Sequence, residues 1–369
     1  MRVLFNAMQA GNQSGTGRYV EELLRALVAL NDAPELTVAW PKDRPTGEWA
    51  DAVKLLRYSR GLRHRLRLDR DLFSISLDVD VVHYPATIGP LWPAKNLVLT
   101  VHDCIPIRHP EWFRWERAFY YIWAGRRSVR NAEHIIADST ATAHDLHELM
   151  EIPPGRVTTV PLGVNDTFCP QPQVAIDAVR TRYQLPERFF LYVGTLEPRK
   201  NLACVVRAWD RIASDIPEDL VIAGRIGWKT EELDIAIATA QHRDRIHRPG
   251  FIDTDDLPAL ICAARAFVWP SLYEGFGLPV LEAMAARVPV LTSNVSSLPE
   301  VIGDTGILVD PENEADLEAG LNRLIFETGD EADRVEAAWQ RAQGMTWSHS
   351  ARILKHSYQA VLDGAGYAP

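Results

Sequence analysis

Cysteines and long apolar runs are scarce in this 369-residue chain, and their scarcity excludes several classes of protein. The four cysteines lie far apart without CxxC or metal-site spacing, so a disulfide-stabilised secreted domain is not expected. We predict buried free thiols in a reducing compartment for Cys104, Cys169, Cys204 and Cys262. No stretch reaches the ~18 apolar residues of a membrane span, and the apolar run after Met1 is too short for a secretion signal. The expected location is the cytoplasm, with peripheral contact at the inner face of the membrane as a further hypothesis.

Positive charge is also in deficit. Lysine and arginine number 39 against 49 aspartates and glutamates, which gives a formal net charge of −10. General nucleic-acid binding needs a basic surface to meet the phosphate backbone, and an acidic chain lacks one. We therefore predict no nucleic-acid partner, and any contact with a polyanion must be local.

The length and the periodicity of the chain predict two α/β domains. A chain of 369 residues exceeds the usual ~100–200 residues of one domain. Short β-rich runs alternate with helical patterns throughout, which predicts parallel sheets covered by helices on both faces. Strands are expected at residues 3–5, 36–39, 79–83, 97–101, 134–137 and 157–160, and again at 189–193, 220–223, 245–247, 266–269, 290–292 and 307–309; the clearest helices of the first half are 17–30, 112–131 and 139–150.

The boundary between the domains is expected at residues 166–173, which carry two prolines and little periodicity. This linker separates a doubly wound domain over residues 1–165 from a second one over residues 174–345. Residues 347–362 have a helical pattern with one apolar side, so we expect the C-terminal segment 346–369 to cross back to the first domain. Ligands in such folds bind at the carboxyl ends of strands and between domains.

A glycine turn with a carboxylate on either side, Glu274 and Glu282, is the most informative stretch of the chain. It follows an apolar strand and precedes a predicted helix over residues 278–287, and Gly275 and Gly277 allow close approach of a ligand. Free backbone N–H groups at the helix start attract phosphate, and ionised carboxylates accept hydrogen bonds from sugar hydroxyls. The alternative is that both glutamates are simply exposed charges.

A basic pair, Arg199 and Lys200, follows a second predicted strand that ends at Gly194. A guanidinium beside an ammonium at the start of a helix suits a diphosphate and would stabilise the charge on a departing nucleoside diphosphate. The alternative is a solvated basic pair, which the position at a strand end disfavours.

Two weaker signals lie in the first half of the chain. The turn around Gly15 and Gly17 follows the first strand and could cradle a phosphate, although it does not fit the dinucleotide-binding pattern and a plain tight turn is equally expected. His102 and Asp103 follow the strand over residues 97–101, where a ligand contact is favoured over a histidine satisfied in the core. No second histidine or acid stands at metal-ligand spacing from His102.

Together these motifs resemble the retaining glycosyltransferase family 4, within the GT-B fold. The resemblance rests on the seven-residue spacing between Glu274 and Glu282, on residues 193–201, on the turn at residues 15–18 and on residues 101–103. It spans nearly the whole chain and is closest to bacterial mannosyltransferases of polysaccharide or O-antigen assembly. It implies that the first domain faces the acceptor and that the second binds a nucleotide sugar.

The resemblance also implies roles for single residues. Glu282 would hold the donor ribose, Glu274 would lie against the donor sugar, and Arg199 with Lys200 would bind the diphosphate. His102 would hydrogen-bond the transferred sugar, and is expected to act with Glu274, Arg199 and Lys200 in catalysis. The remaining donor-binding positions are the phosphate- or acceptor-facing glycines Gly15 and Gly17, the strand-end Gly194, and the backbone N–H groups of Gly275, Phe276, Gly277 and Leu278.

The expected activity is transfer of a hexose, namely mannose from GDP-mannose, to a glycan or lipid-linked glycan with retention of configuration. Neither a cofactor nor a metal is expected. Asp78 and Asp80 form an Asp-x-Asp sequence that precedes its strand, so Arg199 and Lys200 must neutralise the leaving group. The alternatives are a sugar-nucleotide epimerase or hydrolase of the same architecture, and a partner subunit that binds nucleotide sugar without catalysis.

Two further segments bear on the acceptor. Residues 60–70 contain five arginines interleaved with leucines, which could contact anionic lipid, although a solvated loop or helix is the more common explanation. Trp112, Trp115, Phe119 and Trp123 recur at helical spacing. We expect them to pack in the core, with a sugar-stacking or membrane-facing wall as the less favoured hypothesis.

Overall fold

The structure, a computed structural model, describes residues 1–12, 15–60, 62–76, 78–90, 92–327 and 329–364, without the side chains of residues 62–68. The chain forms two compact units. The first contains Met1–Gly163 together with the C-terminal stretch from Met345, and the second contains Val164–Gly344. Each unit is an α/β domain with its own parallel sheet.

The sheet of the first unit has seven parallel strands in the order β3-β2-β1-β4-β5-β6-β7. Six of them match predicted strands to within a few residues, whereas β3 was not predicted because its charged ends break the apolar run. The strands are β1 (Arg2–Asn6), β2 (Glu35–Pro41), β3 (Lys54–Tyr58), β4 (Val81–Tyr84), β5 (Leu97–Val101), β6 (His134–Ala137) and β7 (Val157–Thr159).

Two helices of this unit, α5 and α14, begin at a residue whose side chain caps them. Ser139 precedes α5 and its hydroxyl accepts a hydrogen bond from the backbone N–H of Thr142 at 3.1 Å. Thr346 caps α14 in the same way, with His349 as the donor. The α-helices are α1 (Gly15–Val28), α2 (Leu62–Ser76), α3 (Ile105–Arg108), α4 (Trp115–Asn131), α5 (Thr140–Met150) and α14 (Trp347–Leu362), with short 3-10 turns η1 (Glu48–Ala52), η2 (Pro110–Trp112) and η3 (Pro154–Arg156).

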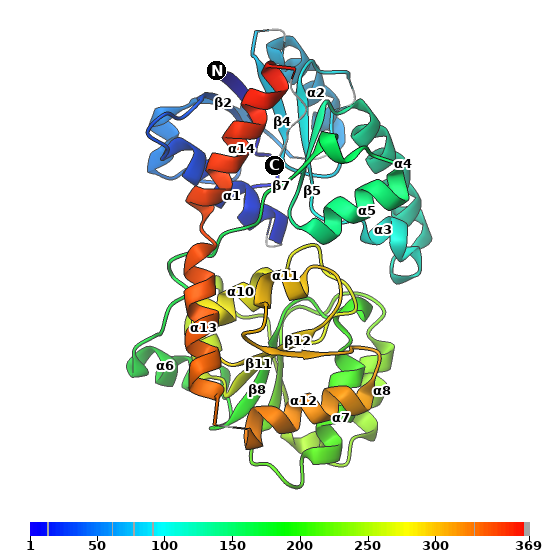
Figure 1. Ribbon diagram of the computed structural model, residues 1–369, viewed down its shortest axis with the longest axis vertical. Helices are drawn as coiled ribbons and strands as arrows, with labels where there is room; N and C mark the ends of the chain where they lie inside the picture. The colour runs from blue at the N-terminus through cyan, green and yellow to red at the C-terminus, as the bar shows by residue number, and fades with distance from the viewer. Residues whose placement is uncertain (13–14, 61, 77, 91, 328, 365–369) are drawn as a thin grey trace. The chain divides into compact units, whose positions relative to one another are not determined.

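Helix α14 belongs to the first unit although the whole second unit precedes it in the sequence. It lies against α1 (Figure 1). The Tyr358 hydroxyl lies 2.6 Å from Nδ1 of His83 on β4, and both side chains are fully buried. The Ser350 hydroxyl donates to the carbonyl of Pro161 at 2.5 Å. The final helix is therefore part of the core of the first unit.

The second unit has a six-stranded parallel sheet in the order β10-β9-β8-β11-β12-β13. Figure 1 shows α7, α8 and α12 on one side of this sheet and α10 and α11 on the other. The strands are β8 (Phe189–Val193), β9 (Asp219–Ala223), β10 (Ile246–Gly250), β11 (Ala266–Trp269), β12 (Val290–Ser293) and β13 (Ile307–Val309). The helices are α6 (Gln173–Tyr183), η4 (Pro198–Lys200), α7 (Leu202–Ile212), α8 (Glu231–Thr239), η5 (Arg243–Arg245), η6 (Thr254–Asp256), α9 (Leu257–Ala263), α10 (Leu278–Ala285), α11 (Leu298–Ile302), α12 (Glu314–Phe326) and α13 (Glu331–Gly344).

The strand order of each sheet reverses direction once, between β1 and β4 in the first unit and between β8 and β11 in the second. The loops on either side of such a reversal separate and leave a crevice at the carboxyl ends of the strands, where ligands of these folds bind. The loops after β8 and β11 carry the basic pair and the first glutamate of the sequence motifs.

Two predictions about burial were wrong. Cys104 and Cys204 are buried, but Cys262 is half-buried and Cys169, in an irregular proline-rich segment, is exposed. Trp115, Phe119 and Trp123 do not pack in the core, because the side of α4 on which they lie faces solvent. Trp112 lies in η2, not on that helix, and is partly buried.

The arginine run at residues 60–70 spans the start of α2. The side chains of Arg63, Arg65 and Arg67 lie outside the described part of the structure, so the hypothesis of a lipid contact there stays a prediction. Arg60 is half-exposed and donates to the carbonyl of Ala10. Among the described helices, none combines the length and the apolar character that crossing a bilayer requires.

Candidate active site

The loops that follow β8 and β11 are joined along their backbones. The two strands are hydrogen-bonded neighbours, with Phe267 opposite Leu191. Beyond the strand ends, the N–H of Leu272 donates to the carbonyl of Arg199 at 2.8 Å. A guanidinium N–H of Arg199 donates to the carbonyl of Tyr273 at 3.1 Å. Hydrogen bonds thus hold the loop of the basic pair against the loop of the glycine turn, although Arg199 and Glu274 are 75 residues apart in sequence.

The carboxylate of Glu274 lies between the two basic side chains of the motif. One oxygen, Oε2, accepts from Nη1 of Arg199 at 2.6 Å, and the other, Oε1, accepts from Nζ of Lys200 at 2.5 Å. Lys200 and Glu274 are 5% and 7% exposed, so the pair is removed from bulk water. The sequence alternatives of a solvated basic pair and an exposed Glu274 are therefore wrong, because the strand-end position buries both.

Two further residues complete the polar network, and the sequence analysis assigned neither a role. Trp269, the last residue of β11, donates its indole N–H to Oε1 of Glu274 at 3.1 Å, and its ring lies 4.2 Å from Nζ of Lys200. The carboxylate of Glu197 lies 2.7 Å from Nε of Arg199. Arg199 thus lies between two carboxylates, which fix its guanidinium in the strand-end loop.

Burial and charge set the protonation states of this network. Burial raises the pKa of Glu274, but the positive charges of Arg199 and Lys200 outweigh it and lower the pKa to about 2. Burial and the neighbouring Arg199 lower the pKa of Lys200 to about 8, against the opposing effect of Glu274. At neutral pH Glu274 is therefore an anion and Lys200 is a cation. The positive charges of Lys200 and Arg199 can attract a phosphate.

The glycine turn between Glu274 and α10 has a backbone conformation that only glycine adopts without strain. Gly277 has a φ of +112°, and a Cβ there would lie 2.9 Å from Cδ2 of Leu298. The Ser297 hydroxyl donates to the carbonyl of Glu274 at 3.0 Å and to that of Phe276 at 2.8 Å. The turn is therefore fixed from α11, and it leads directly into the N-terminus of α10.

The other donor-side positions lie on the same loops. Glu282 is buried in the second turn of α10, not exposed on its surface. The positions expected to lend backbone N–H groups, Gly275, Phe276, Gly277 and Leu278, form the turn and the first residue of α10. Gly194 directly follows β8, and a Cβ there would lie 2.7 Å from the Tyr192 hydroxyl oxygen and 3.0 Å from the Trp269 ring.

In the first unit, His102 follows β5 and is paired with an acid that the sequence analysis missed. The carboxylate of Asp138, which follows the neighbouring strand β6, lies 2.7 Å from Nδ1 of His102. The other ring nitrogen, Nε2, is buried and has no hydrogen-bond partner in the part of the chain that the structure describes. Asp138 could not be found by spacing along the sequence, because it lies 36 residues from His102 and follows the adjacent strand.

Gly15 and Gly17, which we predicted to lie in a phosphate-binding turn, instead form the first turn of α1. A Cβ on Gly17 would lie 2.0 Å from the carbonyl oxygen of Asn12, so glycine is required there by the backbone alone. A Cβ on Gly15 would meet no atom within 4 Å. One turn further along, the Tyr19 ring meets the His102 ring edge-on at 4.8 Å, which connects α1 to the end of β5.

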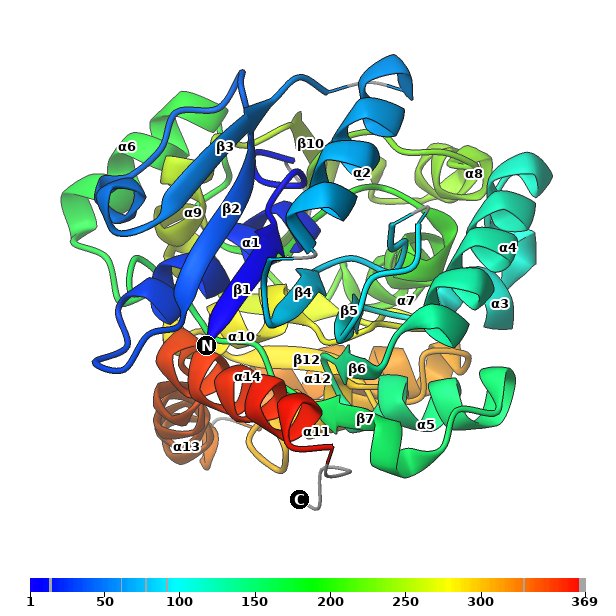
Figure 2. The same ribbon diagram turned by 90° about the horizontal axis from the view of Figure 1, so that it is seen from above.

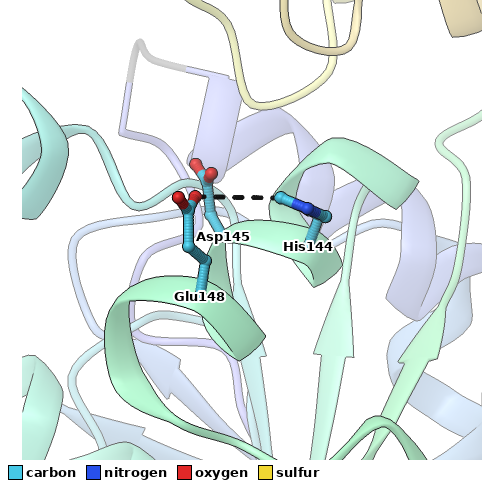
Figure 3. A group of neighbouring side chains, drawn as sticks. All are labelled: His144, Asp145 and Glu148. Atoms are coloured by element: carbon cyan, nitrogen blue, oxygen red, sulfur yellow. Dashed lines mark ion pairs between the residues drawn. The ribbon is translucent and has the colours of Figure 1, made fainter.

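A group of potential metal ligands lies on α5. Figure 3 shows His144, Asp145 and Glu148, whose ligand atoms lie within 4.8 Å of one another. Arg108 donates to the carboxylates of both Asp145 and Glu148, so both acids already have a guanidinium partner. We assign no metal to this group.

The structure thus brings Arg199, Lys200 and Glu274 together in the second unit, with Glu282 on the adjoining helix. His102 and the glycines at 15 and 17 belong to the first unit, where Tyr19 and Asp138 surround the histidine. The hydrogen-bonded network of Arg199, Lys200 and Glu274 at a strand reversal is the strongest candidate for a ligand site.

Comparison with known proteins gives consistent results across the chain. Residues 13–168 match the model of the family described as Glycosyltransferase Family 4, and residues 177–341 match that described as Glycosyl transferases group 1. The O-antigen chain mannosyltransferase B of Escherichia coli is 36% identical, over 94% of this chain and 96% of that protein. The MMP alpha-(1->4)-mannosyltransferase of Mycolicibacterium hassiacum is 31% identical, over 70% of this chain and 65% of that protein. The solved structure of sucrose-phosphate synthase from Thermosynechococcus elongatus superimposes with a TM-score of 0.78 at 19% identity, covering 99% of this chain and 100% of that one, which shows a GT-B fold.

Proposed function

This chain belongs to glycosyltransferase family 4, and on that premise we propose that it transfers mannose from GDP-mannose to a growing glycan with retention of configuration. The observation that carries the proposal is the buried network of Arg199, Lys200 and Glu274 at the strand reversal of the second unit. That network offers two fixed positive charges beside a helix N-terminus, which is what a nucleoside diphosphate requires.

We infer that Arg199 and Lys200 hold the diphosphate and neutralise the charge that develops on it as the sugar leaves. Buried cations interact more strongly with such charge than solvated ones, and they need no reorganisation during the reaction. Glu274 and Glu197 hold Arg199 in position, and Glu274 also faces Lys200. In the proposed scheme the leaving phosphate takes the proton of the acceptor hydroxyl on the same face of the sugar, so the new bond keeps the original configuration.

The remaining roles follow the family pattern. Glu282 holds the donor ribose, Glu274 lies against the donor sugar, and His102 donates a hydrogen bond to the transferred sugar from Nε2. Because two fixed side-chain cations supply the positive charge at the diphosphate, we propose that transfer proceeds without a metal ion or another cofactor. Added EDTA is then expected to leave the rate unchanged, and a strict requirement for a divalent cation would contradict this part of the proposal.

The choice of mannose rests on the names of the relatives. Both relatives described above are mannosyltransferases, and the one that matches over 94% of the chain acts on the O-antigen chain. We therefore propose a glycan or a lipid-linked glycan as the acceptor of this chain, with the donor bound in the second unit.

The test is a thermal-shift screen over GDP, UDP, ADP and their sugar derivatives, followed by a transfer assay with the donor that binds best. A ligand that binds only the folded chain raises its melting temperature by mass action, so GDP and GDP-mannose are expected to give the largest shifts. Turnover of donor to free sugar or to an epimer without any acceptor would identify the rival hydrolase or epimerase. Tight donor binding with no product under any condition would favour a non-catalytic subunit.

A further inference from the structure

Helix α4 carries a continuous stripe of exposed aromatic and basic side chains. Trp115, Phe119 and Trp123 are 77%, 69% and 57% exposed, and each follows the previous one by four residues. Arg126 and Arg130 are also exposed, and they extend the same line at spacings of three and four residues. Residues at these spacings share one side of a helix, so the five side chains form one surface, here called the α4 stripe.

The opposite side of α4 is firmly part of the first unit. Its buried positions are Ala118, Ala124, Gly125, Ser128 and Val129. The Ser128 hydroxyl accepts the N–H of Gly89 at 2.9 Å, and Arg127 donates to the carbonyl of Pro90 at 3.1 Å. Figure 2 shows α4 at the periphery of this unit, beside α3. The α4 stripe is therefore a preformed surface on a fixed helix and requires no refolding to meet a partner.

The chemistry of the α4 stripe is unusual for a surface helix of this protein. A surface helix normally directs polar side chains outward, whereas α4 directs its largest aromatics outward. The helix also carries four arginines against a single glutamate, in a chain whose net charge is −10. Tyr120 is also exposed on the same helix, next to Phe119 in sequence, and widens the aromatic surface.

We propose that the α4 stripe docks the protein on a membrane that contains anionic lipid. Tryptophan and tyrosine favour the interface between headgroups and acyl chains, and arginine pairs with anionic headgroups. Because none of the described helices can span a bilayer, the contact is peripheral, with α4 lying along the membrane plane. A partner protein of acidic surface is the main competing occupant, and the combination of several large aromatics with basic residues on one helix favours lipid over it.

The inference goes beyond sugar transfer, since it concerns where the enzyme is held and not what it catalyses. Its test is sedimentation of the full chain with vesicles of phosphatidylcholine alone and with vesicles of equal parts phosphatidylcholine and phosphatidylglycerol. The chain is expected to bind the anionic vesicles at least roughly tenfold more tightly than the neutral ones, and added salt is expected to weaken that binding.

Two sets of substitutions separate the aromatic and the basic contributions. The variant W115S/F119S/W123S and the variant R126Q/R130Q are each expected to lose roughly tenfold or more of the binding to anionic vesicles. The matched control is F326S/R243Q in the second unit, where Phe326 and the Arg243 side chain are 64% and 66% exposed. All five α4 positions are exposed, so melting temperatures are expected to change little.

Several outcomes would overturn the proposal. They are a wild-type chain that binds no vesicle, equal binding to neutral and anionic vesicles, or equal loss in the control variant. A wild-type chain that elutes as a dimer and becomes monomeric in W115S/F119S/W123S, without vesicle binding, would assign the α4 stripe to self-association. Transfer to a water-soluble acceptor is expected to survive in both α4 variants, so failure of this inference is distinguishable from failure of the proposed function.

Discussion

The carboxylate of Asp138 lies 2.7 Å from Nδ1 of His102, and the two residues follow neighbouring parallel strands. Burial by itself lowers the pKa of His102, but the charges of Asp138 and Asp103 outweigh it and raise the pKa above its ordinary value. The imidazole ring is thereby fixed in orientation, and its second nitrogen is left for a ligand.

We predict that Asp138→Asn lowers kcat by roughly 10- to 100-fold, the cost of losing a hydrogen bond to a charged group. Without the carboxylate, burial dominates and the pKa of His102 falls. The part of the pH–rate profile that reflects the ionisation of His102 is therefore expected to move to lower pH. The measurement is the pH profile of kcat and of kcat/KM. Because Asp138 acts through His102, the double variant with His102→Ala is expected to be no slower than His102→Ala alone.

We predict that Glu274→Gln slows transfer by roughly 100-fold or more, since the cations that stabilise the leaving group lose the carboxylate that positions them. The neutral amide leaves the positive charges of Arg199 and Lys200 less well compensated. The free energy of unfolding of the ligand-free variant is therefore expected to fall. A nucleoside diphosphate supplies the missing negative charge. The thermal shift produced by GDP is therefore expected to be larger in the variant than in the wild type, and a smaller shift would contradict the assigned contact.

The pKa of Lys200 predicts a pH dependence of donor binding. With a pKa lowered to about 8, Lys200 is charged below that pH and loses its proton as the pH rises through it. The affinity for GDP is therefore expected to fall above about pH 8, by at most tenfold for each pH unit, as one proton is linked to binding. Calorimetric titration across this range provides the measurement. In Lys200→Met the affinity is expected to be lower and nearly independent of pH there.

Two glycine substitutions should have different effects on stability. Gly277→Ala forces a side chain into a φ of +112° and against Leu298, so we expect a loss of about 1–3 kcal/mol in the free energy of unfolding. Gly15→Ala meets no atom within 4 Å and is expected to leave the melting temperature unchanged. Calorimetry on both variants tests the difference. If Gly15→Ala also weakens donor or acceptor binding, that effect must come from a ligand and not from folding.

The buried bond between Tyr358 and His83 predicts a stability effect at the end of the chain. Burial lowers the pKa of His83 to about 3, so its ring is neutral and needs a donor for one nitrogen. The ring has two hydroxyl partners, Tyr358 at Nδ1 and Thr100 at Nε2. Tyr358→Phe removes one of them and is expected to cost about 1–3 kcal/mol in the unfolding of the first unit. Urea denaturation measures the loss. Tyr183→Phe, which removes a half-buried hydroxyl contact to Asp256 in the second unit, serves as the control.

Much of the fold was predictable because buried parallel strands have a strong sequence pattern. The bounds of α14, and those of β5, β6, β8 and β11, agree with the sequence prediction to the residue. Strand β3 was missed because Lys54 and Arg57 interrupt its apolar residues, and an edge strand needs only one partner. The exposed aromatics of α4 were expected inside, since periodicity reports that residues share a side of a helix but not whether that side faces the core.

The candidate site was predictable only as far as strand ends could be located. Arg199, Lys200 and Glu274 follow two strands, and the rule that carboxyl ends bind ligands selected them. The same rule could have found Asp138, which directly follows β6, had every polar residue after a strand been considered. That Glu274 pairs with both cations could not be predicted, because side-chain contacts between distant loops depend on backbone positions that no local pattern specifies.

The position of α14 in the first unit has a consequence for anyone who wants to work with one unit at a time. A gene fragment that stops at Gly163 would encode a protein without its own last helix, with the side of α1 that α14 covers left bare. A fragment covering Val164–Gly344, by contrast, encodes the second unit without interruption. To obtain the first unit alone, the segment that begins at Met345 should be linked to Gly163 by a short designed connection in place of the second unit.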